Sequence, residues 1–223
     1  MEIKIVKQIL AWNEDVSREI RAGLAEQKIC LVNIMGSPGG GKTSLIKALL
    51  EQLRGHFRIA VIEADIAGRI DAEAISALGI PVVQLQTDGA CHIEAQAVRE
   101  MLPLFPQDQL DVIFIENVGN LVCPAEFDLG EDLRIAILSV PEGDDKADKY
   151  PLMFSTADAL VINKCDMLPY FDFRPERVEQ STREINGKAV FFRLSARTGE
   201  GIPELAAWLS GRFSQKKALG GSP

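Results

Sequence analysis

The sequence predicts an α/β fold with an open, mainly parallel sheet flanked by helices on both faces. Seven short apolar runs are typical of strands that are buried on both sides. Segments with helical periodicity lie between most of these runs, as expected for a parallel sheet with helical crossovers. Ligands of such folds bind beyond the carboxyl ends of the strands, and the polar motifs of this chain fall there. The predicted strands are 30–35, 58–62, 81–85, 111–115, 133–138, 159–162 and 189–194.

One amphipathic helix is predicted ahead of the first strand, over about residues 3–28. Its apolar side chains recur every three or four positions, which places them on one face. We interpret it as a packed leading helix, because no apolar run approaches the roughly 20 residues that span a bilayer. Residues 1–215 then form a single domain, and we expect a disordered tail at 216–223. The apolar positions of the helix include Ile5, Ile9, Trp12, Val16, Ile20 and Leu24.

Composition narrows the class of protein. The 223 residues are 47% hydrophobic, which supplies a sizeable core, and the formal net charge of −8 leaves no basic field for a phosphate backbone. We therefore expect no nucleic-acid partner. The N-terminus lacks a signal-peptide pattern, so we expect a cytoplasmic protein that does not contact a membrane. In that reducing compartment Cys30, Cys91, Cys123 and Cys165 are interpreted as free thiols or metal ligands.

A glycine-rich segment after the first predicted strand carries a phosphate-binding motif. Residues 36–43 read GSPGGGKT, and a helical segment to about residue 54 follows. The glycines let backbone N–H groups converge on phosphate oxygens at a helix N-terminus. We expect Lys42, a catalytic candidate, to reach the terminal phosphates and Thr43 to ligate Mg²⁺. The motif defines a P-loop NTPase, and its predicted nucleotide contacts are Gly36, Gly39, Gly40, Gly41, Lys42, Thr43 and Ser44.

Two later motifs indicate that the base is guanine. Residues 163–166 (NKCD) and 195–197 (SAR) each follow a predicted strand and resemble the NKxD and SAx elements of GTPases. In that resemblance Asp166 accepts from the N1–H and exocyclic amine of guanine, a pattern that adenine cannot offer, and Lys164 lies along the ring. NKCD alone could be a strand-end turn, but its order after the P-loop favours a base site. The predicted base contacts are Asn163, Lys164, Asp166, Ser195 and Ala196.

Acidic residues at two strand ends predict a magnesium site. Glu116 ends an apolar run and Gly119 follows three residues later, which resembles the DxxG element of GTPases with Glu in place of Asp. Glu116 can hold Mg²⁺ through water, and the Gly119 N–H can sense the γ-phosphate. Glu63 and Asp65 end another strand. Asp65 is our candidate for a magnesium contact and for positioning the attacking water, although either acid could instead cap a helix.

Three residues offer ligands for a soft metal ion. Cys91 and His92 begin a predicted helical segment, and Cys123 lies four residues after Gly119. Thiolate and imidazole suit nickel or zinc, and the ligand set does not choose between them. A loop that moves on hydrolysis would shift Cys123 and so change metal affinity. Three ligands leave a tetrahedral site incomplete, so water or a second chain would complete it. The plain alternative is that these cysteines are small buried apolar residues.

The longer motifs indicate a family. The segments GSPGGGKTSL, EADIAGRIDAEAI, QTDGACHIEA, FIENVGNLVCPAEFDLGE, SVPEGDDKADKYPLMF and ALVINKCDML resemble the HypB family, the nickel-incorporation GTPases of nickel-iron hydrogenase maturation. The resemblance implies a GTPase class that forms a homodimer across its nucleotide faces, with Cys91, His92 and Cys123 at the interface. It also implies partnership with the nickel chaperone HypA and with the hydrogenase large subunit. Lys146 and Lys149 fall in a segment near that contact, although they could equally be ordinary surface lysines.

Two departures from the family pattern matter. Some members begin with a cysteine-rich nickel motif and a histidine-rich stretch, whereas this chain has only two histidines, His56 and His92, and no cysteine before Cys30. We therefore expect no N-terminal nickel store. Ala64 stands where the family more often has Gly, which could alter the local geometry but leaves Asp65 in place.

Other functions stay open from the sequence. The related urease-maturation GTPases use a Cys-Pro-His metal motif, so the adjacent Cys91-His92 pair and residues 116–120 (ENVGN) favour the hydrogenase branch. A P-loop small-molecule kinase would use the acids on a bound acceptor hydroxyl. A metal-storage module with a vestigial nucleotide site would bind metal regardless of nucleotide. Comparing GTP with ATP turnover, with and without candidate acceptors, separates the GTPases from the kinase. Metal affinity that ignores the nucleotide, together with no hydrolysis, would indicate the storage module.

Overall fold

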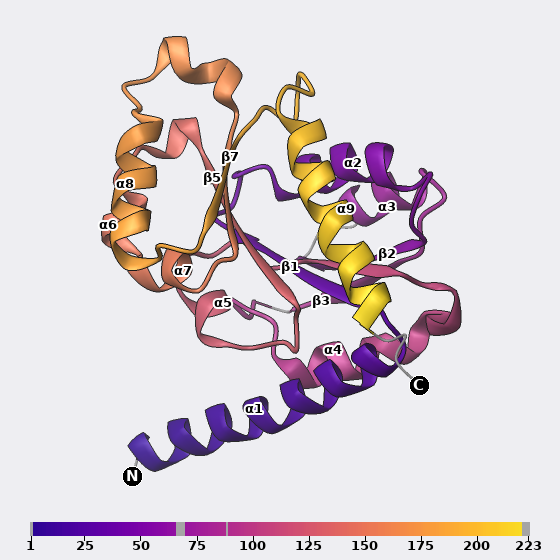
Figure 1. Cartoon of the computed structure of the whole chain (residues 1–223). Coiled ribbons are helices and arrows are strands. Elements are labelled where there is room, and N and C mark those ends of the chain that lie inside the picture. The colour runs from indigo at the N-terminus through magenta and orange to yellow at the C-terminus, as the bar shows by residue number, and fades with distance from the viewer. Residues whose placement is uncertain (1, 66–69, 88, 220–223) are drawn as a thin grey trace.

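A seven-stranded parallel sheet forms the centre of the molecule (Figure 1). In the computed structural model its strand order is β3-β2-β4-β1-β5-β6-β7, and every pairing between neighbouring strands is parallel. The structure describes residues 2–65, 70–87 and 89–219, and within these ranges the side chains of residues 10–64, 72–87 and 89–218. The predicted open, parallel α/β sheet is confirmed.

Each strand coincides with a predicted apolar run and differs from it mainly at its ends. Several strands continue beyond the apolar run into the polar residue that follows it, because the backbone ladder does not stop where hydrophobicity stops. The strands are β1 (Cys30–Gly36), β2 (Ile59–Asp65), β3 (Val82–Gln86), β4 (Val112–Glu116), β5 (Leu133–Ser139), β6 (Ala159–Asn163) and β7 (Val190–Arg193).

Helices connect the strands. The α-helices are α1 (Glu2–Glu26), α2 (Lys42–Leu53), α3 (Ile70–Ser76), α4 (Ala95–Met101), α5 (Cys123–Glu126), α6 (Lys146–Lys149), α7 (Pro151–Ser155), α8 (Pro175–Ile185) and α9 (Ile202–Leu219). Four short 3₁₀ segments complete the described elements: η1 (Leu102–Leu104), η2 (Gln107–Gln109), η3 (Val140–Glu142) and η4 (Cys165–Tyr170).

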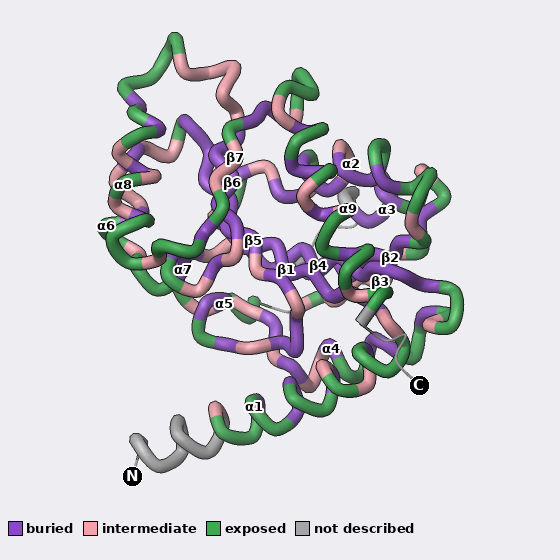
Figure 2. The backbone as a smooth tube through the Cα atoms, viewed as in Figure 1, coloured by how far each residue is buried: buried purple, intermediate pink, exposed green. Residues whose placement is uncertain are grey.

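Successive strand residues point to opposite sides of the sheet and so build separate apolar clusters. Val32 of β1 packs in a cluster with α2 and α9, whereas its neighbour Leu31 packs with α1 and α4. On β6, Val161 joins the first cluster, while Leu160 joins a third cluster with α7 and α8. The inner strands are accordingly buried along almost their whole length, whereas the edge strands β3 and β7, which were expected to be buried, are partly exposed (Figure 2). Helices therefore cover both faces, as predicted.

The leading helix was predicted over about 3–28 and is observed over Glu2–Glu26. It runs along the lower edge of Figure 1 and lies against α4, with Val16, Ile20 and Leu24 buried and its outer side exposed (Figures 1 and 2). Among the described helices none is long and apolar enough to cross a membrane.

The expected tail at 216–223 is wrong at its beginning, because α9 continues to Leu219. Lys216 pairs with Asp132 at 2.5 Å and Lys217 pairs with Asp111 at 2.9 Å, so the last turn is tied to the body of the fold. Residues 220–223 lie outside the described residues.

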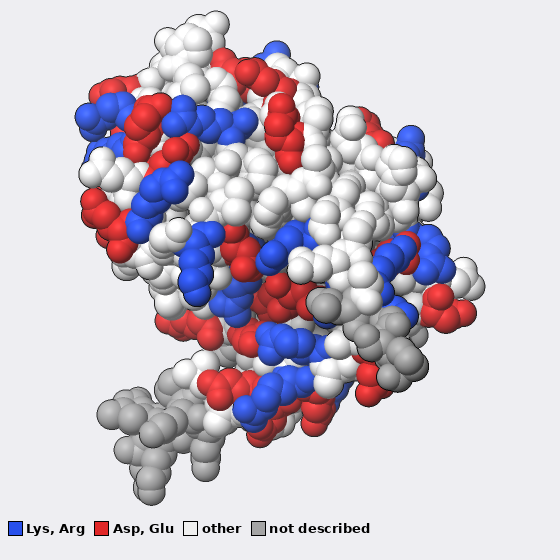
Figure 3. All heavy atoms as spheres, in the orientation of Figure 1, with Lys and Arg blue, Asp and Glu red and all other residues white. Residues whose placement is uncertain are grey.

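Acidic and basic side chains are interspersed on the face drawn in Figure 3. Several charged side chains of the described residues form ion pairs, such as Arg193 with Glu176 at 2.8 Å and Arg177 with Asp148 at 3.1 Å. Among the residues described on this face, no continuous basic field like that of a nucleic-acid surface is visible.

Candidate nucleotide and metal site

The phosphate loop joins β1 to α2, as its motif predicts. Gly39 and Gly41 adopt positive φ angles of 74° and 96°, which glycine reaches without steric cost. Gly41 precedes the first residue of α2, so the loop ends at the N-terminus of that helix, the end at which anions bind. The Lys42 side chain lies back along the loop, where Nζ donates to the Gly36 carbonyl at 3.4 Å and to the Ser37 carbonyl at 3.2 Å.

A cavity of about 450 Å³ opens over this loop. Its lining combines the loop with the ends of β2 and β4, the sheet edge at which parallel folds bind ligands. The described side chains and backbone that line it are Pro38, Gly39, Gly41, Lys42, Thr43, Ser44, Glu63, Ala64, Glu116, Asn117, Val118, Gly119 and Lys164. The predicted phosphate-binding residues Lys42, Thr43 and Ser44 are thus brought together with Glu116 and Gly119.

A second cavity of about 540 Å³ adjoins the first and is suited to a base. The Ser195 hydroxyl donates to Asp166 Oδ1 at 2.7 Å, and the Ala196 N–H donates to Asn163 Oδ1 at 3.1 Å. The first bond fixes the Asp166 carboxylate, which we expect to face guanine. The second joins the ends of β6 and β7. The cavity is lined by Gly41, Ser44, Pro141, Asn163, Lys164, Asp166, Met167, Ala196 and Arg197.

Residues 163–166, the predicted base motif, also donate hydrogen bonds to the phosphate loop. Asn163 Nδ2 donates to the Gly40 carbonyl at 3.0 Å, and Lys164 Nζ donates to the Gly39 carbonyl at 2.7 Å. Lys164 itself has a positive φ of 61°, so the chain turns sharply just where β6 ends. The two cavities are therefore parts of a single site whose walls are hydrogen-bonded to each other.

The acidic residues of the predicted magnesium site lie at the ends of the neighbouring strands β2 and β4. Glu63 and Glu116 are opposite one another on β2 and β4 and are 2% and 6% exposed. The Thr43 hydroxyl donates to Glu116 Oε1 at 2.8 Å. Oxygen atoms of this kind are the ligands that Mg²⁺ takes beside phosphates. Asp65 ends β2, but its side chain lies outside the described residues.

The segment after β4 packs directly on the phosphate loop. The Asn120 N–H donates to the Gly36 carbonyl at 3.0 Å. A Cβ at Gly119 would lie 2.8 Å from the Pro38 nitrogen, so the two backbones touch. The loop that follows leads into α5, whose first residue is Cys123.

The three predicted metal ligands come together (side chains of Cys91, His92 and Cys123). Cys91 Sγ lies 3.1 Å from Cys123 Sγ and 3.5 Å from His92 Nδ1, and one ligand atom of each residue lies within 4.8 Å of the others. The His92 ring stacks on Phe127 with centroids 4.0 Å apart. Two sulfurs and a nitrogen form a donor set for a soft or borderline metal ion.

The surroundings adjust the protonation of these ligands. Burial lowers the pKa of His92, which favours the neutral imidazole that binds metals. The hydrogen bond with Cys91 raises the pKa of the Cys123 thiol. Cys30 is different in kind, because it is buried and burial raises its pKa to about 12. Cys165 donates to the Ile162 carbonyl at 3.3 Å beside the base cavity. Neither belongs to the three-ligand cluster.

Two local expectations are wrong. Cys91 and His92 do not begin a helix, because α4 begins at Ala95, whose N–H is bonded to a side chain of α1. Cys123 is not in an open loop, because it is the first residue of the short helix α5. Cys91 and His92 therefore lie before α4, whereas Cys123 lies in the first turn of α5.

Some contributors carried no local sequence signal. Glu142 in η3 accepts from Ser139 N at 2.7 Å, and it also accepts from the Ser37 hydroxyl in the phosphate loop. Asn117 Nδ2 donates to Asn33 Oδ1 of β1 at 3.1 Å. Ser37 is distant in sequence from Glu142, and Asn33 is distant from Asn117, so only the fold reveals these two contacts. Lys149, named above beside Lys146, pairs with Asp145 at 2.5 Å.

The parallel sheet, the glycine loop after β1 and the cavity-lining loops after β6 and β7 define a P-loop nucleotide-binding protein. A thiol and imidazole cluster, one ligand of which follows the segment that packs on the phosphate loop, distinguishes it within that class. Residues 30–193 match the family model described as CobW/HypB/UreG, nucleotide-binding domain. The chain belongs to the HypB family.

Individual relatives agree with this assignment. The chain is 42% identical over 209 residues to the hydrogenase maturation factor HypB of Escherichia coli K12, covering 94% of this chain and 71% of that one. It is 37% identical over 217 residues to the hydrogenase/urease maturation factor HypB of Helicobacter hepaticus, covering 96% and 89%. The crystal structure of HypB from Helicobacter pylori in complex with nickel superimposes with a TM-score of 0.86, at 33% identity, over 91% of this chain and 95% of that one.

Proposed function

We propose that this protein is a GTP-hydrolysing nickel metallochaperone that couples GTP-dependent dimerisation to nickel binding and delivery during nickel-iron hydrogenase maturation. The names of its relatives and the nickel bound by the Helicobacter pylori protein support the proposal. One domain supplies the chemistry: a phosphate loop, an adjoining base cavity and a soft-metal cluster.

One observation carries the coupling. Gly119 packs on Pro38 of the phosphate loop, and Cys123, four residues later, lies 3.1 Å from Cys91. The Gly119 N–H would sense the γ-phosphate, and a loop that orders with that phosphate would relax after hydrolysis. Any displacement of Gly119 is transmitted through three intervening residues to a metal ligand. Nucleotide state and metal affinity are then reciprocally linked.

Hydrolysis would need a magnesium ion and a positioned water. The Thr43 hydroxyl and the Glu116 carboxylate fit a magnesium site, because both are oxygen donors and lie 2.8 Å apart beside the helix N-terminus. The ion would neutralise charge on the phosphates. Lys42 would turn from the loop carbonyls to the terminal phosphates, and Asp65 is proposed to position the attacking water. Asp166 would select guanine.

The metal cluster is built for transient binding. Three ligands leave a coordination position open, which water or a residue of a second copy fills, and an incomplete site releases its ion more readily than a closed one. We propose a homodimer across the nucleotide faces with Cys91, His92 and Cys123 at the contact. Zinc fits the same donors, so the cluster can hold Ni²⁺ or Zn²⁺.

The partners follow from the family. We propose that the protein receives nickel from, or passes it with, the chaperone HypA and that the hydrogenase large subunit is the acceptor. The protein acts in the cytoplasm, where the thiols stay reduced. Delivery to urease is a second candidate, because the Helicobacter hepaticus relative is named for both enzymes.

The test is a Ni²⁺ titration of the GDP-bound protein, of the protein with a non-hydrolysable GTP analogue, and of the Cys91→Ala variant, each followed by light scattering. We expect nickel affinity to change by roughly 5- to 150-fold between the two nucleotide states. We expect the analogue to favour the dimer and Cys91→Ala to lose tight binding. The Cys30→Ala variant is the matched control, because Cys30 is a buried thiol outside the cluster.

Parallel turnover assays with GTP and ATP complete the experiment. Equal nickel affinity and an unchanged monomer in both nucleotide states would remove the coupling. Phosphate transfer from ATP to an added acceptor would favour the kinase alternative, and tight nickel binding without any hydrolysis would favour the storage alternative.

A further inference from the structure

Asn13 of α1 is a buried polar side chain, 4% exposed, that uses both ends of its amide. Its Oδ1 accepts from the Ala95 N–H at 2.8 Å, and its Nδ2 donates to the Asp128 carbonyl at 2.8 Å. Both partners are backbone groups of segments more than eighty residues away in sequence. Asn13 therefore joins two separate pieces of backbone through one rigid amide.

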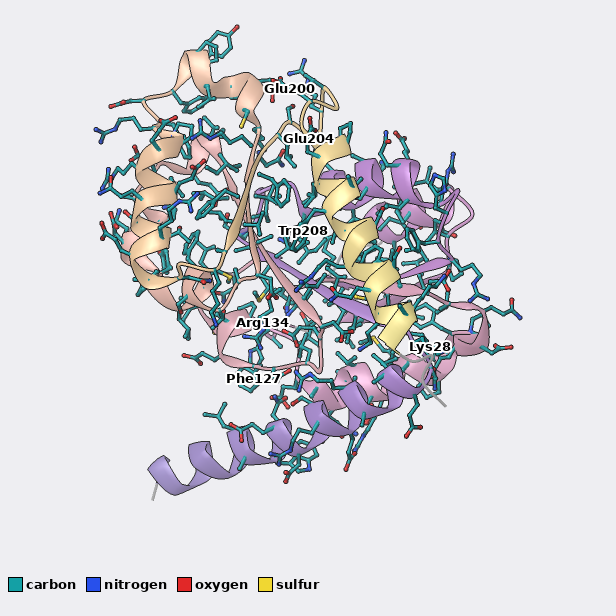
Figure 4. The ribbon with its side chains drawn as sticks, in the orientation of Figure 1. Lys28, Phe127, Arg134, Glu200, Glu204 and Trp208 are labelled. Atoms are coloured by element: carbon teal, nitrogen blue, oxygen red, sulfur yellow. The ribbon has the colours of Figure 1, made fainter. Side chains whose placement is uncertain are left out.

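The two pieces are those that carry the metal ligands. Ala95 is the first residue of α4 and follows His92 by three positions. Asp128 follows Cys123 by five positions and is next to Phe127, on which the His92 ring stacks. Figure 4 labels Phe127, which in this view lies between α5 and α1. One amide thus spans from the Cys91-His92 side of the cluster to the Cys123 side.

The bond to Ala95 replaces a missing helix cap. Glu94, the residue before α4, makes no side-chain cap hydrogen bond, although the first N–H groups of a helix need partners. Asn13 supplies that partner from another helix and so fixes where α4 begins. The start of α4 in turn fixes how far the loop bearing Cys91 and His92 extends.

Neighbouring contacts anchor α1 to the same two pieces. Arg21 donates to both oxygens of Asp128 at 2.7 and 2.8 Å, and Arg99 of α4 pairs with Glu19 at 2.8 Å. Figure 1 shows α1 running alongside α4. These ion pairs are partly exposed, whereas the Asn13 amide is buried. If its hydrogen bonds are lost, the Ala95 N–H and the Asp128 carbonyl have no water to replace them, so the loss is costly.

We propose that Asn13 is a positioning residue for the metal cluster: it holds the Cys91-His92 loop at the distance from the Cys123 segment that a single ion can bridge. This inference rests on the proposed nickel site. It makes the leading helix a part of that site, although α1 contributes none of its three ligands. Replacing Asn13 with leucine keeps the approximate volume but leaves the Ala95 N–H and the Asp128 carbonyl without their partner, so the two segments separate.

The experiment compares Asn13→Leu with two variants of the same helix face. Ser17→Ala removes a buried hydroxyl that bonds only within α1 among the contacts described, to the Glu14 carbonyl at 3.0 Å. Val16→Ala removes apolar packing of α1 and leaves both Asn13 bonds in place. Ni²⁺ is titrated into the GDP-bound proteins and followed by the thiolate-to-nickel charge-transfer absorption, with GDP affinity and Tm measured beside it.

We expect Asn13→Leu to weaken nickel binding by about 10- to 100-fold, as loss of an orienting contact around a metal site does, and to shift the absorption band. GDP affinity should change less than about twofold, because the base and phosphate contacts are untouched. Val16→Ala should lower Tm without changing the band. Asn13→Asp, which keeps an acceptor for the Ala95 N–H, should fall between native and Asn13→Leu and serves if the leucine variant does not fold.

The inference is overturned if Asn13→Leu binds nickel with native affinity and shows an unshifted band. Asn13→Asp is read in the same way if it replaces the leucine variant. Neither result would affect the proposed nickel site itself. An equal loss in Val16→Ala would also overturn the inference, because docking of the helix alone would then be responsible. If the native protein shows no thiolate band with Ni²⁺, both the site and the role of Asn13 fail together.

Discussion

Gly119 and Pro38 are in backbone contact: a Cβ on residue 119 would lie 2.8 Å from the Pro38 nitrogen and 2.9 Å from its Cα. The segment between β4 and α5 therefore rests on the phosphate loop without a side chain between them. Asn120 N–H reinforces the contact through the Gly36 carbonyl at 3.0 Å. The contact lets a change at the phosphates reach the loop that leads to Cys123.

We predict that Gly119→Ala separates the response to the γ-phosphate from nucleotide binding itself. The added methyl group must push the segment off Pro38, so the residue 119 N–H no longer reaches the third phosphate. Losing one hydrogen bond to a charged group costs about 1.5–3 kcal/mol. Affinity for a non-hydrolysable GTP analogue should fall about tenfold or more, while GDP affinity changes little, as measured by fluorescence titration.

Gly211→Ala is the matched control, because a Cβ there meets no atom within 4 Å and the residue lies within α9. It should bind both nucleotides like the native protein. Parallel losses of GDP and GTP affinity in Gly119→Ala would show that the substitution only distorts the phosphate loop.

We predict that Asp166→Asn changes the base preference. Asp166 is held by the Ser195 hydroxyl at 2.7 Å and should accept two hydrogen bonds from guanine. An amide offers one donor and one acceptor, which matches the edge of xanthine better than that of guanine. Charge-assisted hydrogen bonds contribute about 1.5–3 kcal/mol each, so GTP affinity should drop by roughly 100-fold while XTP affinity rises.

Competition titrations of GTP, XTP and ATP against a fluorescent nucleotide measure the change. Asp172→Asn is the matched control, because it makes the same chemical change at an exposed side chain outside the base cavity. It should retain the order of base preference. An Asp166→Asn protein that still prefers GTP would place the base elsewhere.

The sheet could be predicted from the sequence because its inner strands are buried on both faces and form apolar runs, while the edge strands β3 and β7 are only partly buried. The strand ends could not, since β2 and β4 continue to Asp65 and Glu116 on backbone pairing alone. The start of α4 depends on Asn13, 82 residues away, so no local pattern could show that Cys91 and His92 lie before the helix. The end of α9 depends on Asp132 and Asp111 in the same way.

The candidate site was predictable to a different degree. The phosphate and base residues lie in motifs whose spacing is typical of nucleotide binding, and the resemblance to the HypB family groups the three metal ligands. Their proximity could therefore be expected before the fold was known. Glu142 reaches that site through one long-range hydrogen bond and Asn13 through two, and glutamate and asparagine at such positions are ordinary in sequence. Contacts between distant segments become visible only in three dimensions.

We predict that Glu142→Ala loosens the phosphate loop. Glu142 accepts from the Ser37 hydroxyl and from Ser139 N at 2.7 Å, so it links the loop to the end of β5. Without the carboxylate, the nucleotide-free protein should lose about 1.5–3 kcal/mol of unfolding free energy, because the bonds involve a charged group. GTP affinity should fall several-fold, since binding must then order the loop. Urea unfolding and nucleotide titration measure the two effects.

The Glu142→Gln variant distinguishes the effect of the negative charge from the effect of the hydrogen bonds themselves. A glutamine keeps an acceptor for Ser139 N and an amide group that can reach Ser37, so most of the stability should return. If Glu142→Ala unfolds like the native protein, the loop does not depend on this carboxylate.

The last prediction concerns Asp111, whose ion pair with Lys217 connects the end of α9 to the sheet. Asp111 accepts from Arg58 Nη2 at 2.8 Å and from Arg58 N at 2.9 Å, and it pairs with Lys217 at 2.9 Å. Burial alone would raise the pKa of Asp111, but the hydrogen bonds from Arg58 and Lys217 outweigh it and hold that pKa well below its usual range.

A carboxyl group whose pKa is lower in the folded than in the unfolded protein stabilises the fold above its unfolded pKa of about 3.9, and this contribution disappears as the pH falls below that value. Asp111→Asn should therefore reduce the unfolding free energy by about 1.5–3 kcal/mol at pH 7, and the difference from native should shrink as the pH drops below about 4. Urea unfolding across pH 3–8 measures it, with the exposed Asp172→Asn as the control. A difference that stays constant down to pH 3 would mean that the carboxylate charge is not what ties α9 to the sheet.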